Sequence, residues 1–316
     1  MTDAIICEGL TRRYGDLVAV NGLDLVVREG EVFGFLGPNG AGKTTTVRLL
    51  NGLLNPSAGR ARVLGLDVAQ APLEVRRNTG VLTETPSLYE TLSARDNLRF
   101  YGELFDVPEG ALPQRVDDLL GEFGLTERAD DRVGTYSKGM LQRLALARTL
   151  LHEPRILFLD EPTAGLDPSA SRMVNDLIQR LAAQGGHTIF LCTHNLAEAQ
   201  RLCDRIGVID RGTLRAVGSP QELARQIWQT VEVEIDLRGE APPAVLRALE
   251  DLAAVQQHTE EGGGLRLELA SEEDLPDVVA ALVAAGARIY GVIPREHSLE
   301  DIYFEIQEQT VLGEGA

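Results

Sequence analysis

The sequence predicts an α/β fold followed by a smaller α+β domain. From Ile5 to Val217, short β-rich runs alternate with helical stretches, which is typical of α/β proteins. A glycine-rich turn lies between a predicted strand and a predicted helix in this part. Beyond residue 229 the order of elements becomes βαββαβ and the composition becomes strongly acidic. We therefore expect two domains, residues 1–229 and 230–316.

The first domain is built on short strands that are apolar throughout. Val32–Leu36 is such a strand, and the helix predicted over Lys43–Asn51 after the glycine-rich turn ends at Gly52. Ile156–Leu159 and Thr188–Cys192 have the same composition. Because their residues do not alternate between apolar and polar, we expect buried strands of a parallel sheet.

A helical subdomain is predicted over about residues 85–152, because strand signals are missing between Leu92 and Leu150. Its helical segments are Asn97–Tyr101, Val116–Phe123 and Lys138–Leu151. The first domain closes with a helix that begins at Ser219 and Pro220, residue types favoured at a helix start, and runs to about Trp228.

The second domain has the element order of the split βαβ, ferredoxin-like arrangement. We predict a hairpin turn at Glu261–Gly264 between its middle strands. The predicted strands are 231–237, 254–258, 265–269 and 288–293, and the predicted helices are 243–251, 275–285 and 299–308.

Charge and composition exclude several classes of protein. The formal net charge is −18, and residues 230–316 hold five Arg against 19 acidic residues. An acidic chain is a poor partner for nucleic acid. We found no run of about 20 apolar residues that could span a bilayer and no secretory signal at the N-terminus. The three cysteines show no CxxC spacing, which favours a reduced, cytoplasmic setting.

Gly37-Pro-Asn-Gly-Ala-Gly-Lys43-Thr44 matches the P-loop pattern GxxxxGK[ST] in the strand–turn–helix context that this motif requires. The backbone N–H groups of such a loop surround phosphates at the start of the following helix. Lys43 can reach the β- and γ-phosphates, and the Thr44 hydroxyl can ligate Mg²⁺. The residues expected to bind ATP here are Gly37, Asn39, Gly40, Ala41, Gly42, Lys43, Thr44 and Thr45.

Asp160 and Glu161 directly follow the strand Ile156–Leu159, at the end where open α/β sheets bind ligands. We expect Asp160 to hold Mg²⁺ and Glu161 to deprotonate the attacking water. The chain has two lysines: Lys43 lies in the P-loop pattern, and Lys138 lies in the candidate motif Tyr136–Arg143.

Four further segments resemble the ATP-binding-cassette (ABC) family of ATPases. Tyr136–Arg143, which reads YSKGMLQR, resembles the ABC signature motif, and Ala164–Asp167 resembles the D-loop. Thr193-His194 resembles the switch histidine segment, and Tyr14 is similar to the aromatic residue that stacks on adenine. The resemblance covers roughly residues 5–217.

The resemblance implies a homodimer in which two copies close head to tail on two ATP molecules. Ser137 and the Gly139 N–H would then hold the γ-phosphate bound by the other copy, and Asp167 would lie beside the same nucleotide. His194 would contact the γ-phosphate from the side of Lys43. Hydrolysis would depend on the catalytic residues Lys43, Glu161 and His194.

The chain departs from the family pattern at three positions. Lys138 replaces a signature glycine, and Met140 replaces the signature glutamine. Lys138 could add positive charge to the phosphate site or point to solvent. Glu84 stands where the family has the Q-loop glutamine, and its carboxylate could ligate Mg²⁺.

The acidic tail with Ser298–Phe304 resembles ATPases of bacterial systems that export drugs, antibiotics and polysaccharides. That resemblance implies a separate membrane permease and a cytoplasmic location on the inner face of the membrane. Leu88, Tyr89 and Leu92 are candidates either for a groove that receives the permease or for subdomain core.

Two rival functions are open. One is a non-transport ABC ATPase of translation or DNA repair, although this chain has neither a second cassette nor a long coiled coil. The other is a protein that binds ATP without turnover, and the presence of Asp160, Glu161 and His194 argues against it.

Overall fold

The computed structural model describes residues 2–83, 85, 87–183, 186–228, 230–295 and 297–314, with side chains described up to residue 308. The chain forms two compact units, Met1–Pro220 together with Leu312–Ala316, and Gln221–Val311. The domain boundary after residue 229 stays a prediction. No helix of the described ranges is long and apolar enough to cross a membrane.

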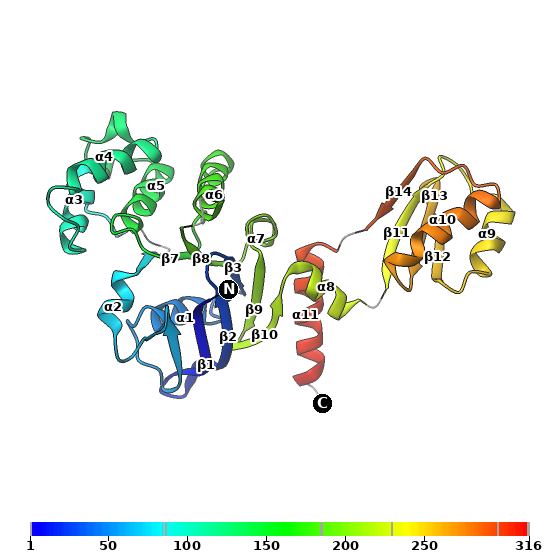
Figure 1. The fold of residues 1–316 in the computed structure, drawn as a ribbon, viewed down its shortest axis with the longest axis horizontal. Coiled ribbons are helices and arrows are strands. Elements are labelled where there is room, and N and C mark those ends of the chain that lie inside the picture. Colours follow the sequence, from blue (N-terminus) through cyan, green and yellow to red (C-terminus); the bar gives the residue numbers. More distant parts are fainter. Residues whose placement is uncertain are drawn as a thin grey trace. The chain divides into compact units, whose positions relative to one another are not determined.

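The first unit contains two sheets (Figure 1). In the larger one, β6, β7, β8, β3 and β9 are parallel neighbours, and β10 is antiparallel at the edge. The second sheet is antiparallel, in the order β2-β1-β4-β5. The strands of the larger sheet are β10 (Thr213–Gly218), β9 (Arg205–Asp210), β3 (Val32–Leu36), β8 (Thr188–Thr193), β7 (Ile156–Asp160) and β6 (Thr79–Leu82), and those of the smaller sheet are β2 (Leu17–Arg28), β1 (Asp3–Tyr14), β4 (Ala58–Val63) and β5 (Leu66–Asp67).

The strands predicted at 32–36, 156–159 and 188–192 are therefore confirmed as buried parallel neighbours. The helices of the first unit are α1 (Lys43–Leu50), α2 (Pro72–Arg77), α3 (Ala94–Leu104), α4 (Leu112–Glu122), α5 (Lys138–Thr149), α6 (Pro168–Ala183) and α7 (Leu196–Leu202). Helices α3 to α5 overlap the three helical segments predicted between residues 97 and 151, and α4 and α5 end one and two residues earlier than predicted. Two short 3₁₀ helices, Thr126–Arg128 and Val133–Thr135, lie between α4 and α5.

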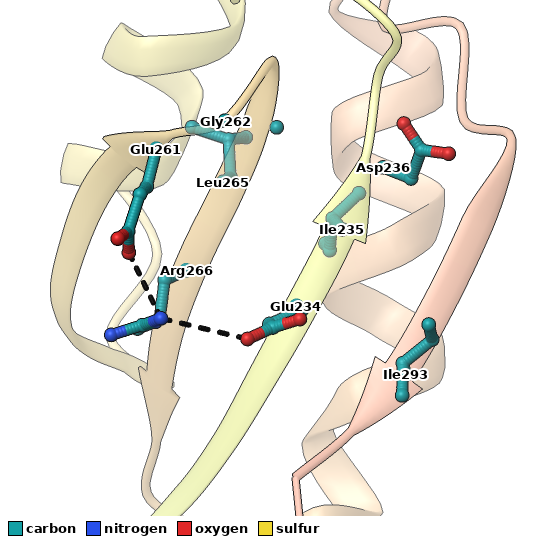
Figure 2. Close-up of a pocket in the computed structure, with 9 residues that line it drawn as sticks. Glu234, Ile235, Asp236, Glu261, Gly262, Leu265, Arg266 and Ile293 are labelled. Carbon is teal, nitrogen blue, oxygen red and sulfur yellow. Dashed lines mark ion pairs between the residues drawn. The ribbon is translucent and has the colours of Figure 1, made fainter.

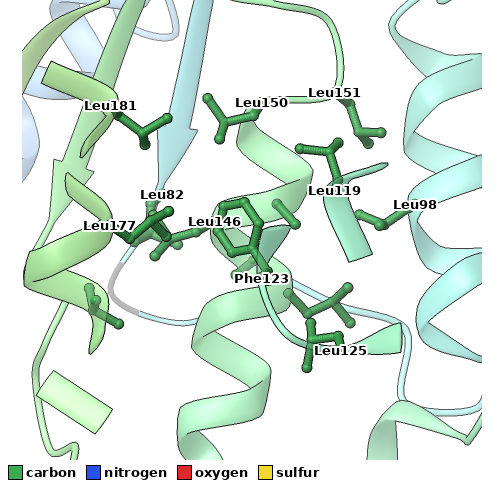
Figure 3. Packing of buried hydrophobic residues seen from close by; sticks show 14 of the residues in the cluster. Leu82, Leu98, Leu119, Phe123, Leu125, Leu146, Leu150, Leu151, Leu177 and Leu181 are labelled. Carbon is green, nitrogen blue, oxygen red and sulfur yellow. The ribbon is translucent and has the colours of Figure 1, made fainter. Parts of the chain in front are cut away.

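One apolar core joins the helical segment to the sheet. Phe123 after α4 and Leu146 on α5 pack in the same buried cluster as Leu82 of β6 and Leu177 of α6 (Figure 3). Burial of such side chains stabilises the fold by about 1.5–3 kcal/mol each. This shared core fixes the position of α5 relative to the sheet edge that carries the candidate site.

The second unit has the topology that the sequence predicts. Its sheet order is β12-β13-β11-β14 with antiparallel neighbours throughout, which is the order of a ferredoxin-like fold. Gly262 and Gly263 form the predicted hairpin turn. The elements are α8 (Pro220–Ile227), β11 (Val231–Asp236), α9 (Pro243–Glu250), β12 (Val255–Glu261), β13 (Gly264–Leu269), α10 (Leu275–Ala284), β14 (Gly291–Pro294) and α11 (Leu299–Glu314), with a 3₁₀ turn at Glu272–Asp274.

Helices α9 and α10 pack on one face of this sheet, where Val233 and Ile235 of β11 are buried. A pocket of about 310 Å³ lies on the sheet, and Arg266 is one of the residues that line it (Figure 2). The guanidinium of Arg266 is 2.9 Å from the carboxylates of both Glu232 and Glu261. Because its charge is balanced by neighbouring carboxylates, Arg266 is a structural element of this acidic face.

Candidate functional site

The candidate site lies at the carboxyl ends of three adjacent strands, in the order β3-β8-β7. Leu36, the last residue of β3, is paired with Thr193, and Asp160 of β7 is paired with Cys192. The glycine-rich turn after β3 and the residues after β7 and β8 therefore share one edge of the sheet. Open α/β sheets bind ligands at this edge.

The loop Gly37–Gly42 has a left-handed backbone at two of its glycines. Gly40 and Gly42 have φ angles of 82° and 110°, in the region that residues with a Cβ seldom adopt. A Cβ at Gly42 would also stand 2.4 Å from the Ala19 carbonyl oxygen. Helix α1 begins at the next residue, so the N–H groups of the loop and of the first helical turn gather at its N-terminus, an arrangement suited to anions.

Lys43 is buried inside this loop. Its Nζ donates to the Gly37 carbonyl oxygen at 2.6 Å and lies 3.3 Å from that of Pro38. The same ammonium is 3.6 Å from Oε1 of Glu161. The predicted cation and the predicted catalytic carboxylate therefore lie side by side.

Thr44 and Asp160 supply oxygen atoms that fit Mg²⁺. The Thr44 hydroxyl donates to Oδ2 of Asp160 at 2.8 Å, and the Asp160 side chain is 5% exposed. A buried carboxylate next to a hydroxyl, beside a phosphate-type loop, is the donor set that this hard cation prefers. Glu84, the third predicted metal ligand, lies outside the described residues.

Glu161 is held in a left-handed backbone conformation, with φ 51°. Its N–H donates to the Cys192 carbonyl oxygen at 2.9 Å, which fixes the turn after β7. Its Oε1 is 2.8 Å from Nδ1 of His194. A non-glycine residue with positive φ at a sheet edge is a known form of local strain at functional sites.

Two cysteine thiols of the first unit, Cys7 and Cys192, are buried. Burial raises the pKa of the Cys192 thiol well above its ordinary value, and the neighbouring Asp160 carboxylate adds to this effect. Cys7, on β1, has its pKa raised to about 12, also mainly by burial. Both thiols therefore stay neutral and act as small apolar side chains, as the sequence predicts for Cys192.

Tyr14 ends β1 and is 40% exposed. The Arg12 guanidinium carbon lies 4.7 Å from the centre of its ring, which covers one ring face. An exposed aromatic ring with one face covered still offers the other face for stacking.

Ser137, Gly139 and Asp167 form a second group. Ser137 caps helix α5 by accepting a hydrogen bond from the Met140 N–H at 3.3 Å, and Asp167 caps the start of α6 by accepting from Ser169 N–H at 2.9 Å. A Cβ on Gly139 would lie 3.0 Å from that of Ala170 of α6, so the two helix starts are in contact.

Lys138 belongs to this second group and is exposed to solvent. Its ammonium lies so close to Gly165 that a Cβ there would stand 2.1 Å from Nζ. Within the described part of the chain, no hydrogen bond or ion pair connects Ser137, Gly139 or Asp167 with Lys43. The predicted ATP-binding residues thus divide into two groups.

Two buried polar residues of the site were missed by the sequence analysis. Gln142 on α5 donates to the carbonyl oxygen of Pro162 at 2.7 Å, which ties the helix to the residue after Glu161. Glu198 on α7 is 3% exposed and accepts a hydrogen bond from Thr193 at 3.2 Å. Their signal in the sequence is weak, because polar residues inside helices are mostly solvent-exposed.

Two family models match the chain. One, described as ABC transporter, matches residues 20–164. The other, described as the C-terminal domain of DrrA1-3-like ATP-binding proteins, matches residues 218–306.

Curated relatives are similar over nearly the whole chain. The daunorubicin resistance ATP-binding protein DrrA2 of Streptomyces coeruleorubidus is 38% identical, over 96% of this chain and 94% of its own. The linearmycin resistance ATP-binding protein LnrL of Bacillus subtilis is 30% identical over 96% and 98%. The fluoroquinolones export ATP-binding protein of Mycobacterium tuberculosis is 38% identical over 96% and 93%.

Solved structures match the larger unit. An ATP-binding subunit of an ABC transporter is 33% identical with a TM-score of 0.65, over 71% of this chain and 92% of its own. The CbiO1 protein of Clostridium perfringens, described as part of the ABC transporter complex CbiONQ, is 30% identical with a TM-score of 0.65, over 72% and 92%.

Proposed function

The chain belongs to the family of ABC transporter ATP-binding proteins, and on this premise we propose that it hydrolyses ATP to drive export through a separate membrane permease. The observation that supports this most directly is that Lys43 and His194 both lie close to Oε1 of Glu161. The hydrogen-bonded pair of Thr44 and Asp160 belongs to the same site. These are the residue types that phosphoryl transfer to water requires.

The loop amides and Lys43 would hold the β- and γ-phosphates of ATP, since they lie at the start of α1. Thr44 and Asp160 would hold Mg²⁺. When bound, the ion would neutralise charge on the phosphate oxygens. Glu161 would take a proton from the attacking water. The oxygen of that water would bond to the γ-phosphorus as the bond between the γ-phosphorus and ADP breaks. His194, 59% exposed and hydrogen-bonded to Glu161, would orient that carboxylate and contact the γ-phosphate.

The second group of site residues supports a homodimer. Ser137 and Gly139 stand at the N-terminus of α5, a position suited to phosphate. We propose that they close on the nucleotide bound by a second copy, together with Asp167. Tyr14 would stack on the adenine of the nucleotide bound in its own chain.

Export is the direction that the relatives support, since those compared above are named for drug resistance or drug export. Residues 218–306 of this chain also match the C-terminal domain of DrrA1-3-like ATP-binding proteins. The chain would work at the cytoplasmic face of the membrane, attached through its permease. Tyr89, which is 47% exposed and in edge contact with Phe100, is a candidate contact for that partner, whereas Leu88 packs against the helical core.

The alternative of an ABC ATPase in translation or DNA repair is not favoured. The similarity to transporter subunits extends over both units of the chain, and residues 230–316 are too acidic for a nucleic-acid surface.

Co-expression with a membrane protein that co-purifies with this chain tests the proposal. Cells that carry both proteins should show ATP-dependent efflux of drugs, which the Glu161→Gln variant should abolish. Purified wild-type chain should hydrolyse ATP only with Mg²⁺. Lack of Mg²⁺-dependent hydrolysis would reject the enzymatic part, and efflux equal in wild type and variant would reject the coupling.

A further inference from the structure

Arg12 is a cation of the first unit for which the proposed mechanism has no role. Its side chain is half-buried on β1, and its Nη1 donates to the carbonyl oxygen of Asn55 at 2.8 Å. Its Nε is buried and has no hydrogen-bond partner within the described residues. The chain has 48 acidic residues against 30 basic ones, yet Arg12 forms no ion pair in the part of the chain that the structure describes. The position of this guanidinium therefore needs an explanation other than pairing with a carboxylate.

Asn55 gives the Arg12 guanidinium a fixed point of attachment. It lies in the segment after α1, and that segment is bonded to β1 on both sides of Arg12. The Ser57 N–H donates to the Thr11 carbonyl oxygen at 2.7 Å, and the Ser57 hydroxyl accepts a hydrogen bond from the Arg13 N–H at 3.0 Å. The carbonyl that binds the guanidinium is therefore itself held close to the strand that carries Arg12.

The Tyr14 ring has few contacts besides Arg12. Tyr14 ends β1, directly before the two-residue turn Gly15-Asp16, and is 40% exposed. The guanidinium carbon of Arg12 lies 4.7 Å from the centre of its ring. Within the described residues, no other aromatic ring contacts Tyr14 and its hydroxyl has no hydrogen bond. An exposed aromatic side chain without such a partner samples several rotamers.

We infer that Arg12 is a positioning residue for the adenine base: it holds one face of the Tyr14 ring by a cation–π contact, so that the opposite face can stack on adenine. This inference rests on the proposed stacking of Tyr14. Arg12 acts on the base through the ring and does not contact the nucleotide.

The energetic basis of this role is the ordering of the ring before ATP arrives. A guanidinium over the face of a tyrosine ring is attracted by the electron density of that face, and more strongly where the cation is partly desolvated. A side chain that must be ordered on binding costs free energy, so a ring that is already ordered binds the base more tightly. The bond from Arg12 to Asn55 keeps the cation on one face and leaves the other face to the base.

The Arg12→Met variant tests the inference, because it keeps most of the length of the side chain and removes the charge. Calorimetric titration without Mg²⁺, in which ATP is not hydrolysed, gives the affinities for ATP and for ribose triphosphate. We expect the variant to bind ATP roughly two- to fivefold more weakly, the equivalent of one exposed cation–π contact. Its affinity for ribose triphosphate should not change. With Mg²⁺, KM for ATP should rise and kcat should stay at the wild-type value.

Arg13→Met is the matched control. Arg13 is the neighbouring arginine, and it is exposed. Its side chain forms no hydrogen bond or ion pair with the residues that the structure describes. This variant loses the same charge and should bind ATP as wild type does. Arg12→Lys keeps a cation near the ring and should recover part of the affinity that Arg12→Met loses.

The double variant of Arg12→Met and Tyr14→Ala shows whether Arg12 acts through the ring. If it does, the double variant should bind ATP no more weakly than Tyr14→Ala alone, because the two changes remove one shared interaction. A further loss in the double variant would overturn the inference, since Arg12 would then contact the nucleotide or support the fold. Equal losses for ATP and ribose triphosphate in Arg12→Met, or wild-type affinity for ATP, would overturn it as well.

If Arg12→Met fails to fold, Arg12→Gln, which also removes the charge, takes its place with the same expected results. Failure of the proposed function has different signatures. A wild-type chain that does not bind ATP would reject the nucleotide site. A Tyr14→Ala variant that loses as much affinity for ribose triphosphate as for ATP would reject the stacking, and the inference with it.

Discussion

Oε1 of Glu161 lies 2.8 Å from Nδ1 of His194, and the two residues follow different strands of the same sheet. The same oxygen is 3.6 Å from Nζ of Lys43. Three segments far apart in the sequence thus meet at one carboxylate. Substitution of one of these side chains at a time therefore tests the role proposed for it.

Glu161→Gln should lower the rate of ATP hydrolysis by roughly 10²- to 10⁴-fold, because an amide cannot accept the proton of the attacking water. ATP affinity should stay at least as high, and ATP should trap a dimer. Phosphate release and size-exclusion chromatography with ATP measure both effects. Glu122→Gln, at an exposed position on α4, is the control. Wild-type turnover in Glu161→Gln would show that another group is the base.

Lys43→Ala should weaken ATP binding by roughly 10- to 150-fold, the equivalent of one charge-assisted hydrogen bond. The ammonium lies within the loop that we propose to hold the phosphates, 2.6 Å from the Gly37 carbonyl oxygen. Calorimetric titration with ATP measures the change. Arg48→Ala, on the exposed side of the same helix, controls for loss of positive charge. Equal affinities in Lys43→Ala and wild type would contradict the assignment.

Tyr14→Ala should weaken ATP binding by roughly 2- to 12-fold, because an aromatic stack contributes about 0.5–1.5 kcal/mol. Tyr14→Phe keeps the ring and should bind as wild type does. Comparison of ATP with ribose triphosphate, which lacks the base, isolates the stacking term. If the alanine variant lost as much affinity for the triphosphate as for ATP, Tyr14 would not act on adenine.

Removal of residues 231–316 also takes away Leu312–Ala316 of the first unit. We still expect the rest of that unit to fold, because among the residues with described side chains its two buried clusters contain none beyond residue 230. We expect the truncated chain to bind ATP with wild-type affinity. The dimer that Glu161→Gln forms with ATP should weaken, since we propose that the acidic domain stabilises or regulates dimerisation. Sedimentation of truncated and full-length Glu161→Gln protein measures this. Unchanged dimerisation, ATPase rate and transport would remove that role.

Local sequence patterns predict the parts of the site that follow directly from single strands. Asp160 and Glu161 come after an apolar run, and the loop before Lys43 has its glycines at fixed spacing, so the amino-acid sequence alone is enough to place both. The split βαβ topology of the second unit is also predictable, because each strand and helix there has a clear period. The last strand is shorter than predicted and begins at Gly291.

Relationships that depend on tertiary contact could not be predicted. Nothing in the sequence near Lys138 indicates that its ammonium lies against Gly165, 27 residues later. The antiparallel sheet of β1, β2, β4 and β5 was missed because its long strands alternate irregularly and contain bulges. Glu198 has the sequence context of an ordinary exposed position on a short helix, and its burial follows from its contacts with Thr163 and Thr193.

The burial of Glu198 predicts how the stability of the protein depends on pH. Burial raises the pKa of this carboxyl above its ordinary value of 4.5. Between 4.5 and the raised value, the folded state therefore holds a proton that the unfolded state has lost. Stability from this group is complete below pH 4.5 and is lost as the pH rises through that window.

Glu198→Gln lacks the titration, so its stability relative to wild type should increase as the pH rises from 4 toward 7. The difference should grow by up to about 1.4 kcal/mol for each pH unit within the window. This corresponds to roughly 3–6 °C in Tm for a folded unit of this size. Scanning calorimetry of both proteins at half-unit pH steps measures it. Titrating groups that do not interact with Glu198 cancel, because both proteins contain them. A difference that stays constant or shrinks with rising pH would show that the carboxyl is not destabilised by burial, and the hydrogen bonds from Thr163 and Thr193 would then outweigh the loss of water around it.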